Sequence, residues 1–434
     1  MNYILNILNK KSTQVIAFSL FLILSTVASL NLFASYFLNK SANGDEYYRE
    51  NIYTFSNIDF EKITYIPAQL YILLASFFNI FINNTLIAPR AVSLFMLLLI
   101  LCYFIYKIVK LDGSRFNKIQ YFLIIFFILC ISRQPFIGTS DFMSYVLLIP
   151  FIIELNECFF NDKKMTNIKV ISFAFLLAAS VFTRPTVVII IISYIISLLF
   201  ILRFNILKSK KVFLIPLASL FFVALFNFGP LKTENKIILD VKEVPKELGT
   251  NWLERNYLMA KFWDEGIYPN TKWVTIEEAV KYKKDNPDAY IPSSNIDLLI
   301  NEPFLYFKQM MRMFISANYT MLLHTNFLYL FAIYLLVVNF FPKNYNFNNY
   351  SITYLDKNTI TVHLLSFYLS IIGFSFLAVK LFEFRWVIPI MIVVVWEILR
   401  LFSKMGGKQI NIYRTIFYLF FTLFIIKGYK IFLI

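Results

Sequence analysis

The chain has 434 residues, of which 59% are hydrophobic, 19% are aromatic and only 15% are charged. Its mean hydropathy of +0.65 excludes a soluble protein of this length and predicts an all-α protein that crosses a membrane many times. The formal net charge of +15 lies around apolar segments, a pattern that indicates membrane topology and no nucleic-acid partner. The three cysteines lack the spacing of metal ligands, so no metal site is predicted on them.

Apolar segments recur along the chain at lengths close to what a bilayer requires, and about 11 transmembrane helices are expected. The first begins after Lys10 and Lys11 and ends without a small-residue cleavage site, which favours a retained span over a signal peptide. The expected spans cover residues 14–36, 88–106, 119–132, 142–157, 168–183, 186–202, 212–229, 325–341, 359–379, 386–402 and 414–432.

Lysine and arginine residues set the expected orientation of these spans. With the N-terminus in the cytoplasm, the inside segments hold nearly twice as many of them as the short outside segments. The segment Tyr65–Ile82 is apolar enough to span, but a span there would place the basic cluster at 107–118 outside. We therefore predict an interfacial helix in the first outer loop, with a true span as the alternative.

The expected spans divide the chain into three parts. Residues 1–229 form an N-terminal transmembrane module, whose first outer loop, 37–87, is the expected catalytic segment. Residues 230–324 form a large outer cap loop between spans seven and eight, and residues 325–434 form the C-terminal transmembrane helices. A loop as long as this cap is expected to fold and not to act as a linker.

Two helix starts are predicted within the cap loop. Thr275 and Glu278 have the spacing of a capping box, which predicts a helix as far as Lys284. Ser294 is expected to cap a second helix, which Pro303 interrupts.

Two adjacent acids, Asp45 and Glu46, follow the first expected span after a short polar hinge. A carboxylate this close to a bilayer is costly to dehydrate, and such acids usually have a function. An ordinary solvated loop is the competing interpretation. The positions of the other charges near the spans favour a functional pair.

These other charges collect on the same outer side. They lie in short outer turns and comprise Arg133, Asp141, Arg184, Lys380, Glu383 and Arg385. Turns this short lie near the headgroup layer, so their cations are held close to lipid phosphates. A single Arg there is often only a snorkelling anchor. Several cations on the side expected to be poor in them instead predict a site for a lipid-linked phosphate, formed by Arg133, Arg184, Lys380 and Arg385.

Carboxylates beside a ring of phosphate-binding cations suggest glycosyl transfer from a polyprenyl-phosphate sugar. Asp45 is the predicted general base, which accepts the proton of the incoming hydroxyl while the cations stabilise the departing lipid phosphate. Glu46 is expected to orient the acceptor hydroxyl or to help hold a divalent cation, Mg²⁺ or Mn²⁺. Further substrate contacts are expected from Asp141, His324 and Glu383, with a capped or interfacial role as the alternative for His324.

Charges near the cytoplasmic ends of the spans have a simpler interpretation. Glu154 and Glu397 are expected to pair with neighbouring Lys or Arg residues and to remain solvated. His363, at the start of span nine, is expected to be structural. The interiors of the expected spans are otherwise nearly free of charge.

Parts of the chain resemble a known family. The acidic pair, the interfacial helix and Arg90 at the start of the second span resemble the GT-C superfamily of lipid-phosphate-sugar-dependent glycosyltransferases. Within it, the block 45–71, which opens Asp-Glu-Tyr-Tyr, and the block 380–389, Lys-Leu-Phe-Glu-Phe-Arg-Trp-Val-Ile-Pro, are similar to the dolichyl-phosphate-glucose-dependent alpha-1,2-glucosyltransferase. Pro67 is single where relatives have a proline pair, and Trp-Asp-Pro is absent near Asp59, so the sugar and the acceptor stay open.

The resemblance implies a GT-C-type bundle and an inverting sugar transfer on the non-cytoplasmic face, with glucose as one candidate sugar. Asp45 is then the base and Arg90 contacts substrate. The implied partners are a polyprenyl-phosphate sugar donor, a glycan or lipid-linked acceptor, and membrane lipids. A bacterial inner membrane with the site facing the periplasm is the preferred location; a eukaryotic source would place the site in the ER lumen.

Two other functions are compatible with a chain of this kind. An O-antigen or capsule polymerase or ligase also has about a dozen spans, but it uses a lipid-diphosphate donor and key cations of its large outer loop. A polysaccharide flippase or transporter without catalysis would have broken helices with charges near the middle of the membrane. The nearly charge-free span interiors favour the enzyme.

Overall fold

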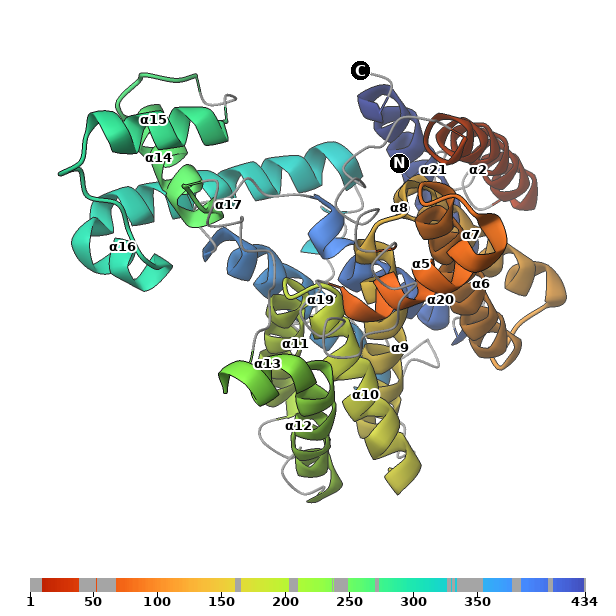
Figure 1. Ribbon diagram of the computed structural model, residues 1–434. Coiled ribbons are helices and arrows are strands. Elements are labelled where there is room, and N and C mark those ends of the chain that lie inside the picture. The colour runs from red at the N-terminus through yellow and green to blue at the C-terminus, as the bar shows by residue number, and fades with distance from the viewer. Residues whose placement is uncertain are drawn as a thin grey trace.

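The computed structural model describes residues 10–38, 52, 68–160, 165–202, 210–235, 237, 249–269, 273–325, 329, 332–333, 354–376, 384–404 and 409–432. Over these residues the regular secondary structure is helical and contains no strand, which confirms the predicted all-α class. Figure 1 shows the helices in chain order, from α2 in red to α21 in dark blue.

Five helices in the described part of the chain are long and apolar enough to cross a membrane. All five coincide with expected spans, and they are consistent with an integral membrane protein. They are Lys11–Phe37 (α2, Lys11–Leu32, with the π-helical turn η1, Phe33–Phe37), α6 (Ile87–Val109), α9 (Ser140–Phe160), Asn358–Phe376 within α19 (Tyr354–Phe376), and Arg385–Lys404 (part of η6, Phe384–Val387, with α20, Ile388–Lys404).

Apart from α21, the other helices of the bundle are shorter than these five. Several of them overlap expected spans, whereas the expected span 325–341 lies mainly outside the described residues. They are α5 (Gln69–Ile82), α7 (Arg115–Ile131), α8 (Gln134–Ile137), α10 (Asn167–Thr183), α11 (Val187–Leu202), η3 (Lys210–Phe213), α12 (Leu214–Phe226), α13 (Phe228–Glu234) and α21 (Gln409–Phe432).

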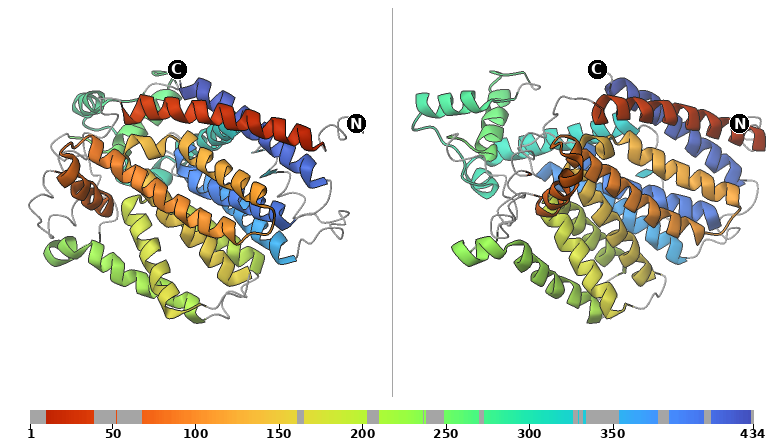
Figure 2. Two further views of the ribbon diagram at one scale, coloured as in Figure 1. Left: turned by 90° about the vertical axis from the view of Figure 1, so that its right-hand side faces the viewer. Right: turned by 45° about the vertical axis from the view of Figure 1, so that its right-hand side comes forward.

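The helices pack mainly as long neighbouring pairs. The first helix, α2, runs beside the last, α21, in both views of Figure 2, and α11 runs beside α19. On the other side of the bundle α10 packs between α9 and α12. The ends of the chain are therefore joined by direct contact, although hundreds of residues separate α2 from α21 in the sequence.

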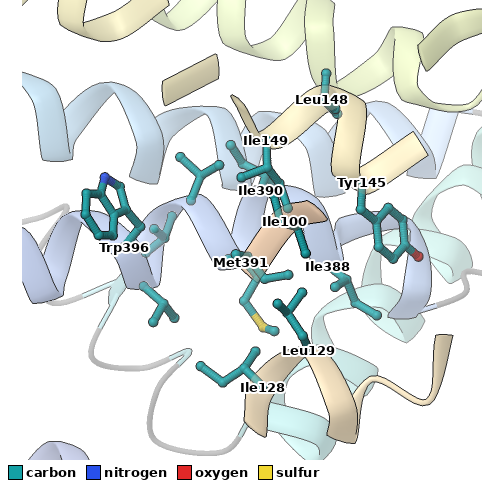
Figure 3. Close-up of a cluster of buried hydrophobic side chains, with 14 of the residues drawn as sticks. Ile100, Ile128, Leu129, Tyr145, Leu148, Ile149, Ile388, Ile390, Met391 and Trp396 are labelled. Carbon is teal, nitrogen blue, oxygen red and sulfur yellow. The ribbon is translucent and has the colours of Figure 1, made fainter. Parts of the chain in front are cut away.

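Helix α20 is the centre of the bundle, with α7 on one side and α9 on another. Every residue from Ile388 to Arg400 is buried. Figure 3 shows Ile388, Ile390 and Met391 of α20 packed among side chains of α6, α7 and α9. From Ile388 to Trp396 the helix is apolar on all faces, as expected of a helix in the middle of a protein or a membrane.

Helix α5 occupies part of the segment predicted to lie in the interface. With 14 residues it is about 21 Å long, less than the roughly 30 Å of hydrocarbon in a bilayer. It lies across α6, to which the Tyr71 hydroxyl is tied by a 3.0 Å hydrogen bond to the Pro89 carbonyl (Figure 1). Phe77, Ile80 and Phe81 of α5 are exposed. Both its length and its direction suit the interfacial prediction.

In its described residues from 249 onward, the cap loop forms four helices, α14 (Trp252–Asp264), α15 (Ile276–Asp285), α16 (Asn295–Asn301) and α17 (Pro303–Thr325). They enclose a small apolar core of their own, to which Tyr257 and Leu298 contribute. Burial, together with the 2.8 Å hydrogen bond that its hydroxyl donates to Glu302, raises the pKa of Tyr257. Its phenol therefore stays a neutral donor that holds α14 against the α16–α17 junction.

Both predicted helix starts in the cap are confirmed. The Thr275 hydroxyl accepts from the Glu278 N–H at 3.2 Å, and the Glu278 carboxylate accepts from the Thr275 N–H at 2.9 Å. The Ser294 hydroxyl accepts from the Asp297 N–H at 3.0 Å. The helix break at Pro303 is also confirmed: α16 ends at Asn301, and Pro303 begins α17, a position that needs no N–H donor.

A buried polar cluster joins four helices in the half of the bundle expected to face the cytoplasm. The Glu397 carboxylate of α20 accepts from Arg400 Nε at 2.6 Å and lies 3.7 Å from His363 Nε2 of α19. His363 also lies 2.6 Å from the Asn156 side chain of α9, which accepts from the Tyr194 hydroxyl of α11 at 3.2 Å. These contacts fix the four helices relative to one another.

The cluster corrects one sequence prediction. Glu397 pairs with an Arg, as expected, but it is only 3% exposed and is not solvated. Glu154 also pairs as expected, with the buried Lys107 just beyond the second expected span. The sequence places Glu397 near a helix end, but α7, α9 and α19 surround α20 and exclude solvent there.

Replacing Glu397 with Ala should lower the free energy of unfolding by about 3–5 kcal/mol, because it leaves the buried Arg400 guanidinium without its carboxylate. Thermal unfolding in detergent measures the change. The matched control is Glu265→Ala in the cap, where the carboxylate is exposed and only a small effect is expected. Equal melting of the two variants would contradict a stabilising role for the buried cluster.

Candidate functional site

Three of the predicted site residues meet at one end of the bundle. Asp141 lies in the first turn of α9 and its side chain is only 4% exposed. Arg184 Nε lies 2.7 Å from Asp141 Oδ1, and Arg385 Nη1 lies 3.1 Å from Asp141 Oδ2. One carboxylate therefore holds two guanidinium groups, which come from the end of α10 and from η6.

The local sequence explains how each of these groups reaches the site. Asp141 lies at a helix N-terminus, where the backbone dipole favours a carboxylate. Arg184 precedes Pro185, which disfavours helical backbone, and it ends α10 with an extended conformation at φ −152° and ψ 100°. Arg385 lies in the 3₁₀ turn η6, directly before α20. All three positions are helix ends, so their side chains converge without interrupting a helix.

Tyr145 fixes the backbone of the Arg385 turn. Its hydroxyl donates to the Arg385 carbonyl at 2.6 Å. Tyr145 follows Asp141 by four residues on α9, so both side chains lie on the same face of that helix. Helix α9 thus binds Arg385 twice, through the guanidinium and through the main chain.

The cluster of Asp141, Arg184 and Arg385 carries a formal charge of +1, because one carboxylate neutralises only one of the two cations. The exposure of the side chains rises from 4% for Asp141 to 14% for Arg184 and 31% for Arg385. The positive charge is therefore most accessible at Arg385. An anion that approaches this end of the bundle meets guanidinium groups whose orientation is already fixed.

Arg133 and Arg90 lie at the same end and hold the end of η1. Arg133 Nη1 donates to the Tyr36 hydroxyl at 3.2 Å, and its guanidinium lies 5.7 Å from the centre of that ring. Arg90 is 2% exposed, and its Nη1 donates to the Phe37 carbonyl at 2.7 Å. These contacts position the last turn of the first span, directly before the segment that contains the acidic pair.

Two residues beside α8 have strained backbone conformations. Arg133 has a positive φ of 58°, which costs about 1–2 kcal/mol for a residue with a side chain. Gly138 also has a positive φ, of 69°, and a Cβ there would lie 2.9 Å from the Arg90 backbone nitrogen. The glycine allows the loop after α8 to pack directly on the start of α6.

The remaining predicted site residues divide into two groups. Asp45, Glu46, Lys380 and Glu383 lie outside the described residues. His324 lies in the last turn of α17. Among the described residues, no group of three His, Cys, Asp or Glu side chains could hold a metal ion. The expectation of a divalent cation therefore stays with the acidic pair and is a prediction.

Sequence reasoning missed Tyr36, Tyr145 and Gly138. Tyr145 follows Asp141 by four residues along an expected helix, and this spacing could have indicated that the two side chains lie on the same face. Gly138 stands in a short outer turn, where a positive φ is common. Nothing in the sequence connects Tyr36 to Arg133, because that contact is made across 97 residues.

Comparison of the chain with protein-family models, with curated proteins and with solved structures gave no match. The function is therefore inferred from the residues of the site, from their geometry and from the resemblance of the two sequence blocks.

Gly138→Ala should displace Arg90, because the new Cβ would lie 2.9 Å from both its backbone nitrogen and its Cγ. Gly266 is a matched control: it has nearly the same φ, of 70°, and no atom within 4 Å of a built Cβ. Both variants carry the cost of a positive φ, about 1–2 kcal/mol. Thermal unfolding in detergent should show a clearly larger loss for Gly138→Ala, and equal losses would contradict the close approach.

Asp141→Asn should destabilise the protein by about 3–5 kcal/mol, because Arg184 and Arg385 lose their shared counter-charge. Combining it with Arg385→Gln should restore part of the loss, since the double variant has one uncompensated charge fewer. A double-mutant cycle of unfolding free energies measures the coupling, and Asp288→Asn, at an exposed position, is the control. Strictly additive effects would show that the two residues do not interact.

Proposed function

We propose that this chain is a GT-C-type membrane glycosyltransferase with about eleven spans, a number that follows from the length a bilayer requires. It transfers a sugar, with inversion, from a polyprenyl-phosphate donor to a glycan or lipid-linked acceptor on the non-cytoplasmic face. The observation that carries the proposal is the cluster in which Asp141 holds Arg184 and Arg385 together at one end of the bundle.

This cluster supports binding of a lipid-linked phosphate. Guanidinium groups match the geometry of phosphate oxygens and bind them in pairs. Asp141 fixes the orientation of both cations before the substrate arrives, so little reorganisation is needed when negative charge develops. Arg184 and Arg385 both attract anions, and Lys380 precedes Arg385 by five residues in the sequence. Arg133 is the fourth cation assigned to this phosphate.

In the proposed reaction, Asp45 accepts the proton of the acceptor hydroxyl as its oxygen forms a bond to the anomeric carbon. The bond from that carbon to the phosphate oxygen breaks, and its electron pair leaves with the lipid phosphate. Arg184 and Arg385 stabilise this leaving group, an interaction that strengthens in the transition state. Glu46 orients the acceptor, and His324 and Glu383 complete the substrate contacts.

The cap offers less support for the polymerase or ligase alternative, which would use cations of the large loop. Arg255 donates to the Val274 carbonyl through Nε at 3.1 Å and Nη2 at 2.9 Å. Lys283 lies 2.9 Å from Glu254. These cations hold the cap helices to one another. In the same way, the buried Arg400 and Lys107 are paired within the bundle, which gives the transporter alternative no specific support.

Asp45→Asn should lower kcat by about 10²–10⁴-fold, the usual contribution of a general base. The assay is sugar transfer by the full chain in proteoliposomes with a polyprenyl-phosphate sugar, and Asp112→Asn, at an exposed turn, is the control. Unchanged transfer by Asp45→Asn would remove the proposed mechanism. Activity only with a diphosphate donor would instead favour the polymerase or ligase.

A further inference from the structure

One helix of the cap exposes an apolar stripe along nearly its whole length. The residues recur at intervals of three or four and lie on one face of α17: Phe304, Phe307, Met311, Ile315, Tyr319 and Leu322. Their exposed fractions range from 40% to 78%. The exposed face of a helix in a soluble domain is polar, so an exposed apolar face of this length marks a contact with lipid or with another protein.

The opposite face of α17 is already buried. Tyr306 and Met313 pack in the cap core, and Tyr306 donates to the Phe376 carbonyl of α19 at 2.8 Å. Ala317 and Met321 are fully buried in the main bundle. The helix therefore joins the cap to the bundle through one face and leaves the apolar stripe outside.

The two cations of α17 lie along the edge of the stripe, where the Lys308 ammonium is 5.9 Å from the centre of the Phe304 ring. Lys308 and Arg312 both pair with Asp264 of α14, and Arg312 Nη2 lies 3.5 Å from its Oδ1. These cations therefore lie on the flank that faces the cap. The preceding helix, α16, extends the apolar surface with Ile296 and Ile300, both more than two-thirds exposed.

The direction of α17 relative to the spans indicates that lipid covers the stripe. Figure 1 shows α17 extending across the page, and the left view of Figure 2, turned by 90°, shows it nearly end-on while α2, α6 and α20 run across the page. It thus crosses the direction of the spans. A helix at the end of a membrane bundle with this orientation lies along the plane of the bilayer.

The stripe also continues into the lipid-facing surface of the bundle. Helix α17 packs against α19 and α21, and both expose apolar side chains beside it, among them Phe376, Leu423 and Ile426. Tyr319 is of a residue type enriched at the boundary between lipid and water. A stripe that joins a surface already facing acyl chains needs no separate protein partner.

We propose that α17 lies in the outer membrane interface with this stripe among the lipid acyl chains. The helix anchors the cap to the outer leaflet, and since α17 also contacts η6, it holds the cap beside Arg385. The inference needs only a membrane-embedded bundle and does not depend on glycosyl transfer.

Site-directed nitroxide labelling tests the placement. The full chain, with Cys102, Cys130 and Cys158 replaced by Ala, is labelled singly at Met311, Ile315 or Tyr319 and reconstituted into nanodiscs of phosphatidylethanolamine and phosphatidylglycerol. Collision rates are measured with oxygen, which concentrates in lipid, and with a water-soluble nickel chelate. The matched controls are labels at Glu277 and Lys281, which are exposed on α15.

Labels on the stripe should collide more with oxygen than with nickel, and labels on α15 should show the reverse ratio. Nickel accessibility on the stripe equal to that of the controls would overturn the proposal, since the face would be in water. Low collision with both reagents would also overturn it, since a second copy or another protein would then cover the helix. Labelled variants that melt like the unlabelled parent exclude misfolding as the cause.

Discussion

The arrangement of one end of the bundle depends on one buried carboxylate. Asp141 is bound by Arg184 and Arg385, and this shared ion pair fixes α9, α10 and the turn before α20 relative to one another. A cluster of two guanidinium groups would repel itself without a carboxylate between them. With one, it becomes a group in which both guanidinium groups have a fixed orientation.

A second buried cluster of charged residues lies toward the other end of the bundle, but its formal charges have a different sum. There Glu397 is paired with Arg400 and contacts His363, and the formal charges of the ionised pair cancel. A neutral cluster buried among four helices stabilises their packing but does not attract an ion. The contrast favours the cluster of Asp141, Arg184 and Arg385, with its partly exposed Arg385, as the site proposed for an anionic substrate.

The cap is related to this site through α17. One face of the helix packs on the cap core and on the bundle, and its N-terminal part is bonded to the end of α19. If its outer face lies in lipid, the cap is held at the level at which a polyprenyl-phosphate donor presents its headgroup. The depth of the cap in the membrane would then contribute to the site together with the cations.

The sequence was enough to predict the helical class, the caps at Thr275 and Ser294 and the placement of Asp141, Arg184 and Arg385 near helix ends, because these depend on hydropathy, on local hydrogen bonds and on Pro185 beside Arg184. It did not determine which charges pair. The contact of Asp141 with Arg385 spans 244 residues, and Glu397 is buried only because three other helices surround α20. Such contacts follow from the packing of helices that lie far apart in the chain, and no local sequence pattern encodes that packing.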